Sequence, residues 1–359
     1  MLAAAMTRDT MLKPFLDRLG ARWAPFSGID SSADFGDPDG ECRALRQRAG
    51  LLVRPWAEVL VLTGADRQRF LGGLTTADVK ALAPGSGAFG FITDRKGHLL
   101  ADMVVLAAED RLLLELPPGR STAILEHLSH YRIADRVEIV ADDAPLIATI
   151  LGPGATSVLT EFLTMAPPDA PWAHRSHALL PTAVRVVRDC RWGVAAWSLW
   201  IDGEHRQVLA QLLAAGRGEG LMPVGWRALE TLRIEAGWPR FGQDIDGGNF
   251  PQETGLEAEA VSYTKGCYLG QEVVARIHYR GGVQRRLCGL RFDRPAADPT
   301  GATLLLGERT VGTVTSFAMS ETRGAIGLGV LHRSAEADAV VHATGIGEAH
   351  VVSLADRAQ

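Results

Sequence analysis

The C-terminal part of the chain is the sequence feature that most constrains the fold. From Gly281 onward the sequence contains only short β-forming segments separated by turn-forming residues, with no helical pattern between them. This spacing predicts a small antiparallel barrel or sandwich over residues 281–359. Its strands are expected at Val283–Phe292, Thr303–Leu306, Val311–Phe317, Ala325–Leu331, Ala339–Ala343 and His350–Leu354.

Strand and helix patterns alternate in the preceding part of the chain. Glu58–Thr63 reads as a strand that is closed by Gly64 and followed by a short helix, and the same order recurs loosely around Gly152. This repeated order suggests two similar α/β units rather than one continuous sheet. Tight turns such as Asp94–Gly97 favour an α+β fold over a doubly wound parallel one. Other strands are expected at Ala88–Ile92, Leu99–Leu106, Leu112–Leu116, Val137–Val140, Val184–Val187 and Ala195–Ile201, and helices near Ser121–His130, Glu204–Ala215 and Trp226–Ala236.

The first part of the chain carries weaker patterns. Met1–Met11 lacks a basic segment that leads into a long apolar stretch, so we interpret it as a frayed or overextended start. Turn-forming residues crowd Ser27–Glu41, which predicts a surface loop, with ordered structure resuming near Arg43. We therefore assign residues 1–42 to an N-terminal extension and loop, and residues 43–280 to the two α/β lobes.

Composition and charge exclude several classes of protein. With 359 residues, 47% hydrophobic and 22% charged, the chain can build a large core of ordinary soluble type. The net charge of −5 does not indicate general nucleic-acid binding, although a local basic patch could be hidden by the average. No apolar run approaches the roughly 18 residues of a membrane span, and no glycine-rich phosphate loop follows a strand.

The four cysteines are widely separated and form no CxxC pair, which indicates a reduced, cytoplasmic compartment. No ligand cluster for a metal or for an iron–sulfur cluster is visible in the sequence. A cluster bound here would therefore need ligands from a partner.

The segment Lys265–Glu272, with the sequence KGCYLGQE, indicates a functional loop rather than core. Gly266 and Gly270 free the backbone to turn or to approach a ligand, and Lys265 and Cys267 offer a cation and a soft nucleophile. The segment resembles the KGCYxGQE motif of the YgfZ family, which are folate-binding proteins related to the aminomethyltransferase of the glycine cleavage system and to mitochondrial iron–sulfur assembly factors.

The resemblance extends over most of the chain, from about Ala57 to Leu354. Phe250–Glu253 precedes the motif, and Val273–Arg276 and Tyr279–Gly281 follow it, in the order of the family. Two further segments resemble the RLEAG…YG and LTNDV segments of the aminomethyltransferases: Leu232–Gly237 with Gly242–Ile245, and Leu74–Val79. The resemblance implies two α/β lobes and a C-terminal barrel arranged around a central folate-binding cavity.

The resemblance also implies a site for tetrahydrofolate or a derivative. The matching glutamate, Glu235, would accept hydrogen bonds from the pterin. The alternatives are a solvated acid, or an acid paired with Arg233 or Arg240. Lys265 would meet the anionic end of folate, unless it is a plain surface amine.

Three further residues complete the predicted folate site. Tyr268 and Gln271 belong to the same loop, although Gln271 alternatively only satisfies backbone N–H groups in the first turn of a helix. Asp102 is the third. Aminomethyltransferases carry two adjacent acids at this place, and here Ala101 stands beside Asp102, so one carboxylate of the pair is missing. Because proton transfer needs a positioned carboxylate, this departure argues against ordinary aminomethyl transfer.

Cys267 is the candidate catalytic residue. A thiol beside Lys265 and a free backbone N–H would have thiolate character, as a metal ligand or a redox or carrier group. The alternative is a small buried hydrophobe, which is how we interpret Cys42, Cys190 and Cys288.

The leading hypothesis is a cytoplasmic folate-binding accessory protein, more an assembly factor than an enzyme, that helps to assemble iron–sulfur clusters or maintain iron–sulfur enzymes, including tRNA-modifying ones. The alternative is a folate-dependent aminomethyl- or methyltransferase. Expected partners are folate and iron–sulfur assembly proteins or their client enzymes, and no membrane. The cluster of basic residues over Arg276–Arg286 could bind tRNA, an acidic protein partner or polyglutamyl folate. The alternative is a solvated strand face.

Overall fold

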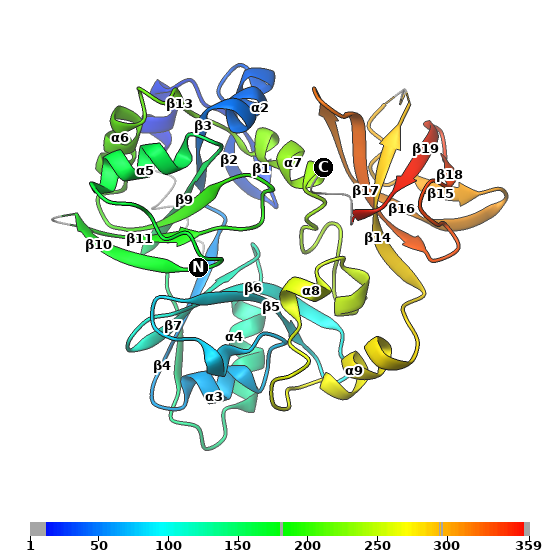
Figure 1. The fold of residues 1–359 in the computed structure, drawn as a ribbon, viewed down its shortest axis with the longest axis horizontal. Coiled ribbons are helices and arrows are strands. Elements are labelled where there is room, and N and C mark those ends of the chain that lie inside the picture. Colours follow the sequence, from blue (N-terminus) through cyan, green and yellow to red (C-terminus); the bar gives the residue numbers. More distant parts are fainter. Residues whose placement is uncertain (1–11, 180–181, 294, 296, 355–359) are drawn as a thin grey trace. The chain divides into compact units, whose positions relative to one another are not determined.

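The computed structural model describes residues 12–179, 182–293, 295 and 297–354, so Met1–Met11 lies outside the described residues. The chain forms two compact units (Figure 1). The first unit comprises residues 12–70, Val79–Ala88 and Met103–Leu229, and the second comprises Leu71–Asp78, Phe89–Asp102 and residues 230–354. None of the helices described is long and apolar enough to cross a membrane.

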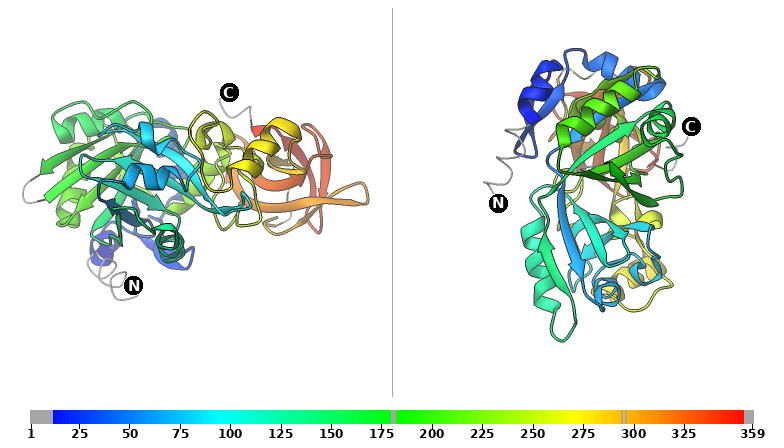
Figure 2. Two further views of the ribbon diagram at one scale, coloured as in Figure 1. Left: turned by 90° about the horizontal axis from the view of Figure 1, so that it is seen from below. Right: turned by 90° about the vertical axis from the view of Figure 1, so that its left-hand side faces the viewer.

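A six-stranded sheet with helices on one face forms the larger core of the first unit. Its order is β10-β11-β12-β9-β3-β13, antiparallel except for the short pairing of β13 with β3. Helices α5 and α6 pack on one face (Figures 1 and 2) and bury alternate strand residues such as Trp197, Leu199 and Ile201. The elements are β3 (Ala49–Arg54), β9 (Pro145–Leu151), β10 (His174–Leu179), β11 (Thr182–Arg188), β12 (Ala196–Asp202), β13 (Leu221–Pro223), α5 (Ala155–Leu163) and α6 (His205–Ala215).

A separate five-stranded sheet has the order β5-β6-β7-β4-β8. Helix α4 packs against β4 and β8 (Figure 2). The elements are β4 (Glu58–Thr63), α3 (Arg67–Gly72), η1 (Val79–Ala81), β5 (Gly87–Thr93), β6 (Leu99–Ala107), β7 (Arg111–Leu116), α4 (Ser121–Tyr131) and β8 (Glu138–Ala141). The predicted turn between β5 and β6 is present, because Asp94 and His98 pair through their backbones and the Gly97 N–H donates to the Asp94 carbonyl.

The predicted recurrence of a strand–glycine–helix unit is confirmed. Gly64 ends β4 with φ +100°, and Gly152 ends β9 with φ +109°. Each strand belongs to a different sheet, and a short helix follows each glycine. Two sheets, rather than one continuous sheet, therefore underlie the α/β part.

The prediction of a loop over Ser27–Glu41 is wrong. The segment contains strand β2 (Ile29–Asp34), which pairs with β1 (Arg22–Phe26), and the start of helix α2 (Pro38–Gln47), which Asp37 caps. At least one acid of this segment is buried with partners: the Glu41 carboxylate accepts hydrogen bonds from the Phe35 and Gly225 N–H groups. Pattern alone does not distinguish a solvated acid from a buried acid with partners.

A buried ion-pair cluster lies within the first unit. Glu115 on β7 accepts hydrogen bonds from Arg54 on β3 and from Arg191, each at 2.7 Å. Arg191 also pairs with Asp189 at 2.6 Å, and Asp189 accepts a hydrogen bond from Ser198 on β12. Burial alone would raise the pKa of Glu115, but the two arginines outweigh it and hold that pKa below its ordinary value. The cluster joins the two sheets through matched charges.

The C-terminal strands form a closed barrel with the order β14-β17-β16-β15-β18-β19, which confirms the predicted antiparallel β domain and the α+β class. Alternate residues such as Leu290, Val314 and Val341 fill its core. Its strands are β14 (Arg285–Phe292), β15 (Thr303–Leu306), β16 (Arg309–Ser320), β17 (Gly324–His332), β18 (Val340–Ala343) and β19 (Gly347–Val352). The remaining elements are α7 (Trp226–Glu235), η2 (Pro251–Glu253), α8 (Glu257–Ala260) and α9 (Gln271–Arg280).

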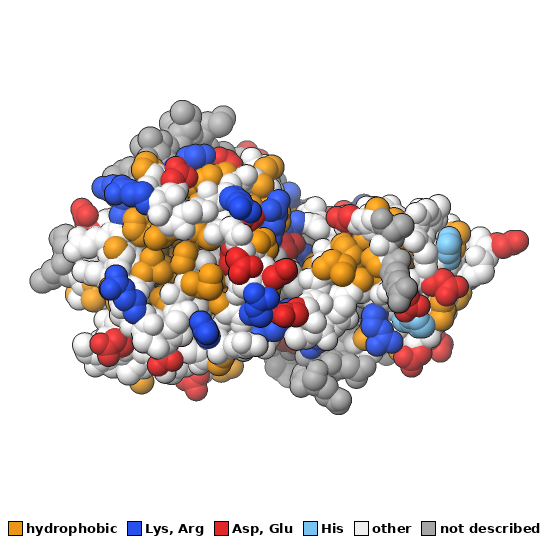
Figure 3. All heavy atoms as spheres, turned by 90° about the horizontal axis from the view of Figure 1, so that it is seen from above, with side chains coloured by type: hydrophobic (Ala, Val, Ile, Leu, Met, Phe, Trp, Pro, Cys, Tyr) orange, Lys and Arg blue, Asp and Glu red, His pale blue; other side chains and the backbone are white. Residues whose placement is uncertain are grey.

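Surface charge is mixed on the face shown in Figure 3. Acidic and basic side chains of the described residues lie interspersed among hydrophobic ones on this face. This mixture of charges agrees with the net charge of −5, which does not indicate general nucleic-acid binding.

Candidate functional site

Lys265 anchors the loop that carries the KGCYLGQE sequence. Its ammonium donates hydrogen bonds to three backbone carbonyl oxygens: Gly72 at 2.7 Å, Thr75 at 2.5 Å and Ala77 at 2.9 Å. The ammonium also lies 4.7 Å from the ring centroid of Tyr268. Since an ammonium has three N–H donors, these acceptors match its capacity. The geometry therefore gives Lys265 an anchoring role that the sequence did not indicate, and its contact with folate stays a prediction.

Backbone and threonine contacts hold both ends of the same loop. The Ser262 N–H donates to the Thr76 carbonyl, and the Thr76 hydroxyl donates to the Ala260 carbonyl at 2.6 Å. At the other end, the Leu269 N–H donates to the Gly73 carbonyl, and its own carbonyl accepts from the Thr93 hydroxyl at 2.7 Å. The segment that resembles LTNDV thus serves as the frame on which the KGCYLGQE loop is built.

Gly270 is the glycine that this loop requires. Its φ of +81° lies in the left-handed region, and a Cβ there would lie 2.4 Å from the Asp94 carbonyl oxygen and 2.9 Å from the Gly97 Cα. A Cβ on Gly266 would meet open space. The close approach therefore occurs at the start of α9, against the turn between β5 and β6.

Cys267 lies at the exposed tip of the anchored loop. Of the four cysteines, it alone is exposed, while Cys288 is buried in β14 and Cys42 and Cys190 are half-buried. Burial raises the pKa of the Cys190 and Cys288 thiols. The buried alternative for Cys267 is thus excluded, whereas its catalytic role stays a prediction.

Tyr268 and Gln271 flank the tip of the loop. Tyr268 is buried beneath Lys265, and burial, with a smaller contribution from Glu257, raises the pKa of its hydroxyl. Gln271 is the first residue of α9, and its side-chain oxygen accepts from the Tyr268 N–H at 3.3 Å. The Gln271 side chain thus satisfies the backbone N–H of Tyr268, which lies before the first turn of α9 rather than in it. The contacts of Tyr268 and Gln271 with folate stay predictions.

Glu235 ends α7 and lines a pocket of about 400 Å³ on the barrel. The Ser320 hydroxyl donates to its carboxylate, and the Arg323 guanidinium donates to its backbone carbonyl at 3.1 Å. Arg291 and Arg323 line the same pocket. Sequence reasoning missed Ser320 because 85 positions separate it from Glu235.

One alternative for Glu235 was an ion pair with Arg233, and Arg233 does not form it. It pairs instead with Glu230 at 2.8 Å and with the buried Asp244 at 2.7 Å, and it donates to the Ser316 hydroxyl. Burial alone would lower the pKa of Arg233, but the two carboxylates outweigh it and raise the pKa. This network fastens α7 to β16, which gives the segments Leu232–Gly237 and Gly242–Ile245 a structural role.

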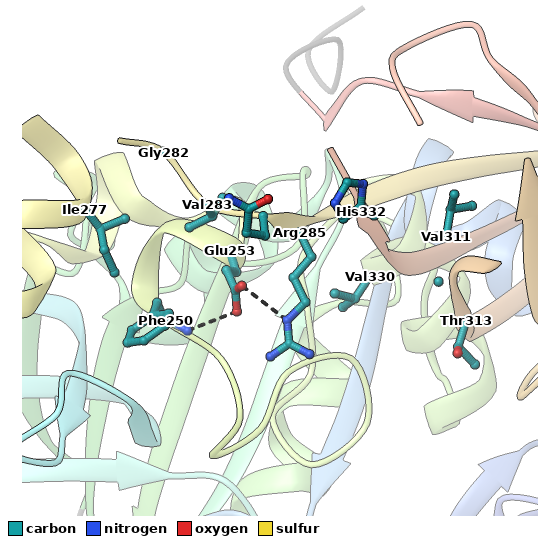
Figure 4. A pocket seen from close by; sticks show the side chains of 12 residues that line it. Phe250, Glu253, Ile277, Gly282, Val283, Arg285, Val311, Thr313, Val330 and His332 are labelled. Carbon is teal, nitrogen blue, oxygen red and sulfur yellow. Dashed lines mark hydrogen bonds and ion pairs between the residues drawn. The ribbon is translucent and has the colours of Figure 1, made fainter. Parts of the chain in front are cut away.

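A further pocket, of about 610 Å³, lies between η2, α9 and the barrel (Figure 4). Glu253 and Arg285 point toward one another from η2 and β14, with the Arg285 Nε 3.2 Å from the carboxylate. Glu253 also accepts from the Phe250 N–H, and the apolar part of the lining includes Ile277 and Val330. The segment Phe250–Glu253 is thus part of a pocket wall.

Two family models together match almost the whole described chain. The GCVT N-terminal domain matches residues 12–265, and the glycine cleavage T-protein C-terminal barrel domain matches residues 285–356. The chain belongs to the glycine cleavage T-protein family.

Curated relatives in this family carry two kinds of name. An aminomethyltransferase from Streptomyces coelicolor is 26% identical over 333 residues, which cover 90% of this chain and 88% of the relative. A tRNA-modifying protein YgfZ from Yersinia pseudotuberculosis is 30% identical over 292 residues, which cover 80% of this chain and 85% of the relative. The glycine cleavage T-protein family thus includes relatives with both names.

The fold of a glycine cleavage T-protein is also found by structure comparison. The crystal structure of glycine cleavage system aminomethyltransferase T from Bartonella henselae matches with a TM-score of 0.85 at 20% identity, over 96% of each chain. At this identity the match bears on the fold alone. It supports two α/β lobes followed by a barrel.

Residues of β6 bear on which chemistry this family member performs. Ala101 is fully buried, and the adjacent Asp102 is half-buried. Since successive strand residues point to opposite faces, these positions lie on opposite faces of β6. Of the two positions, Asp102 alone carries a carboxylate. Its contact with a ligand stays a prediction.

The cluster of basic residues over Arg276–Arg286 does not lie on a strand throughout. Arg276, His278 and Arg280 lie on helix α9, whereas Arg285 and Arg286 lie on strand β14. A helix or a turn was expected to begin after Gly270, and the helix is present, running from Gln271 to Arg280 with Gly281 immediately after it. Among the residues described, no group of three or more histidine, cysteine or acidic side chains is placed to hold a metal ion.

Proposed function

We propose that this protein is a folate-binding accessory factor of the YgfZ type, which supports the assembly or maintenance of iron–sulfur enzymes, including tRNA-modifying ones. The observation that carries the proposal is the exposure of Cys267 on a loop anchored by Lys265. A thiol held at the surface by a fixed loop is suited to meet a partner's cluster or a reactive one-carbon species. The curated relative named tRNA-modifying protein YgfZ supports this choice.

The pocket beside Glu235 offers groups that fit tetrahydrofolate. A carboxylate accepts hydrogen bonds from a pterin edge, and the Ser320 hydroxyl holds this carboxylate in place. Arg291 and Arg323 line the same pocket and suit the carboxylates of a glutamate tail. Bound tetrahydrofolate would supply a carrier for one-carbon units. Lys265, Tyr268, Gln271 and Asp102 remain part of the proposed site.

Cluster ligands in this proposal come from a partner, an assembly protein or a client enzyme. The described residues offer one exposed thiol and no grouped metal ligands, whereas an iron–sulfur cluster typically needs four ligands. A contact with tRNA at Arg276–Arg286 and a cytoplasmic location belong to the same proposal.

The alternative is a folate-dependent aminomethyl- or methyltransferase, which the relatives named aminomethyltransferase favour. Ala101 disfavours it, because a fully buried methyl group stands where the resemblance expects a second acid.

Calorimetry with tetrahydrofolate on the purified chain tests the folate part of the proposal. Saturable binding at one site is expected, and the absence of binding would contradict it. Tetrahydrofolate-dependent transfer of an aminomethyl or methyl group, measured in the same preparation, would support the transferase alternative instead.

A further inference from the structure

Helix α9 presents an aromatic ring between two cations. Arg276, Tyr279 and Arg280 are spaced i, i+3 and i+4, so they share one face of the helix, here named the α9 face. Both arginine side chains are exposed, and 71% of Tyr279 is exposed, which is unusual for a large aromatic residue. The opposite side of the helix buries Val274 and lines a pocket with Ile277. The α9 face therefore lies away from the side on which the helix buries Val274.

Neighbouring rings hold the Tyr279 ring in place. It contacts the His278 ring edge-on, with centroids 4.8 Å apart, and the Tyr263 ring with centroids 6.0 Å apart. His278 itself stacks on Tyr263 at 3.9 Å, and its Nδ1 lies 2.7 Å from the Glu257 carboxylate. An exposed ring supported in this way loses little conformational entropy when a partner binds.

The two cations of the α9 face are not neutralised by carboxylates. Among the described residues, neither Arg276 nor Arg280 forms an ion pair, and Glu272, one turn before Arg276, is exposed and does not reach it. Arg285, in contrast, pairs with the buried Glu253. Two uncommitted guanidinium groups thus flank one exposed ring.

We propose that the α9 face binds single-stranded RNA, with a base stacked on Tyr279 and the flanking phosphates paired with Arg276 and Arg280. Sequence-tolerant single-strand binding combines these same elements, an aromatic platform and a positively charged track. An acidic peptide would need the cations but not the ring. The choice of RNA over DNA rests on the proposed function, whereas the surface itself depends on neither folate nor Cys267.

Fluorescence anisotropy with a labelled single-stranded oligoribonucleotide of mixed sequence tests the proposal, with single-stranded DNA of the same sequence as the second arm. We expect Tyr279→Leu to weaken RNA binding on the order of ten-fold, and Tyr279→Phe to change it by less than about two-fold, because stacking needs the ring and not the hydroxyl. Arg276→Gln with Arg280→Gln should also weaken binding and reduce the salt slope by about 1.4, since each phosphate contact on a single strand contributes about 0.7.

The matched control is Arg206→Gln with Arg217→Gln, which removes the same charge from two other exposed positions. This control should bind like the wild type. Equal RNA affinity of Tyr279→Leu and the wild type, or equal losses in both double variants, would overturn the proposal, the first outcome pointing to an acidic protein partner. Equal affinity for DNA would overturn the choice of RNA. Unchanged tetrahydrofolate binding by Tyr279→Leu separates this result from a failure of the proposed function.

Discussion

The side-chain ammonium of Lys265 lies 2.7 Å from the backbone carbonyl oxygen of Gly72, a residue 193 positions earlier in the chain. With two further carbonyl oxygens it forms the anchor of the loop that exposes Cys267. The cation of the motif therefore acts first on the chain itself. Its removal should alter the loop before it alters any ligand contact.

Lys265→Met should lower the free energy of unfolding by about 2–3 kcal/mol, because hydrogen bonds to a charged group contribute about 1.5–3 kcal/mol and methionine keeps the aliphatic stem. Urea unfolding measures this change. The matched surface control is Lys96→Met, which removes an exposed lysine from the turn between β5 and β6 and should leave stability nearly unchanged. Equal stability of the Lys265 variant and the wild type would contradict the anchoring role.

Gly270→Ala should destabilise the protein by about 1–3 kcal/mol, because the backbone there is left-handed and a Cβ would collide with the Asp94 carbonyl oxygen. Gly266→Ala is the control in the same loop and should change stability by less than about 0.5 kcal/mol, as expected for an open surface position. Thermal unfolding of the two variants side by side decides the point. Similar losses in both would show that the loop geometry is wrong.

The buried ion-pair cluster should make the fold sensitive to acid. The pKa values of Glu115 and Asp189 lie below their ordinary values of 4.5 and 3.8. Burial opposes this shift and the nearby arginines outweigh it. Because the folded-state values are depressed, the stabilisation is complete above the ordinary values and is lost as pH falls through the folded-state values.

Glu115→Gln tests that cluster directly. It leaves two buried arginines with one carboxylate fewer, so we expect a loss of about 3–5 kcal/mol near neutral pH and a shallower decline in acid. The exposed Glu161→Gln on α5 provides the control and should keep the wild-type profile. A wild-type pH profile for the Glu115 variant would refute the role of the cluster.

The strands and the barrel could be predicted from the sequence because each depends on local pattern. Glu58–Thr63 and Thr303–Leu306 have the predicted bounds. The contacts that build the site could not be predicted, since they join distant positions: Lys265 with Gly72, and Glu235 with Ser320. Buried acids such as Glu41 were misread for the same reason, because their partners are not visible in the local sequence.

Glu235→Ala should weaken tetrahydrofolate binding several-fold or more, since one charge-assisted hydrogen bond contributes roughly 1.5–3 kcal/mol. Ser320→Ala should weaken it less, because it loosens the carboxylate without removing it. Calorimetry with both variants gives the order of the two effects. Unchanged affinity in the Glu235 variant would exclude the pterin assignment.

The central claim is that the exposed thiol of Cys267 carries the accessory function. The decisive measurement is the activity of an iron–sulfur enzyme under oxidative stress in cells that lack the protein, with wild type, Cys267→Ser and Cys288→Ser expressed at equal levels. We expect Cys267→Ser to keep its fold and tetrahydrofolate affinity and to restore no activity, whereas Cys288→Ser, at a buried barrel position, restores it. Full restoration of activity by Cys267→Ser would contradict the account.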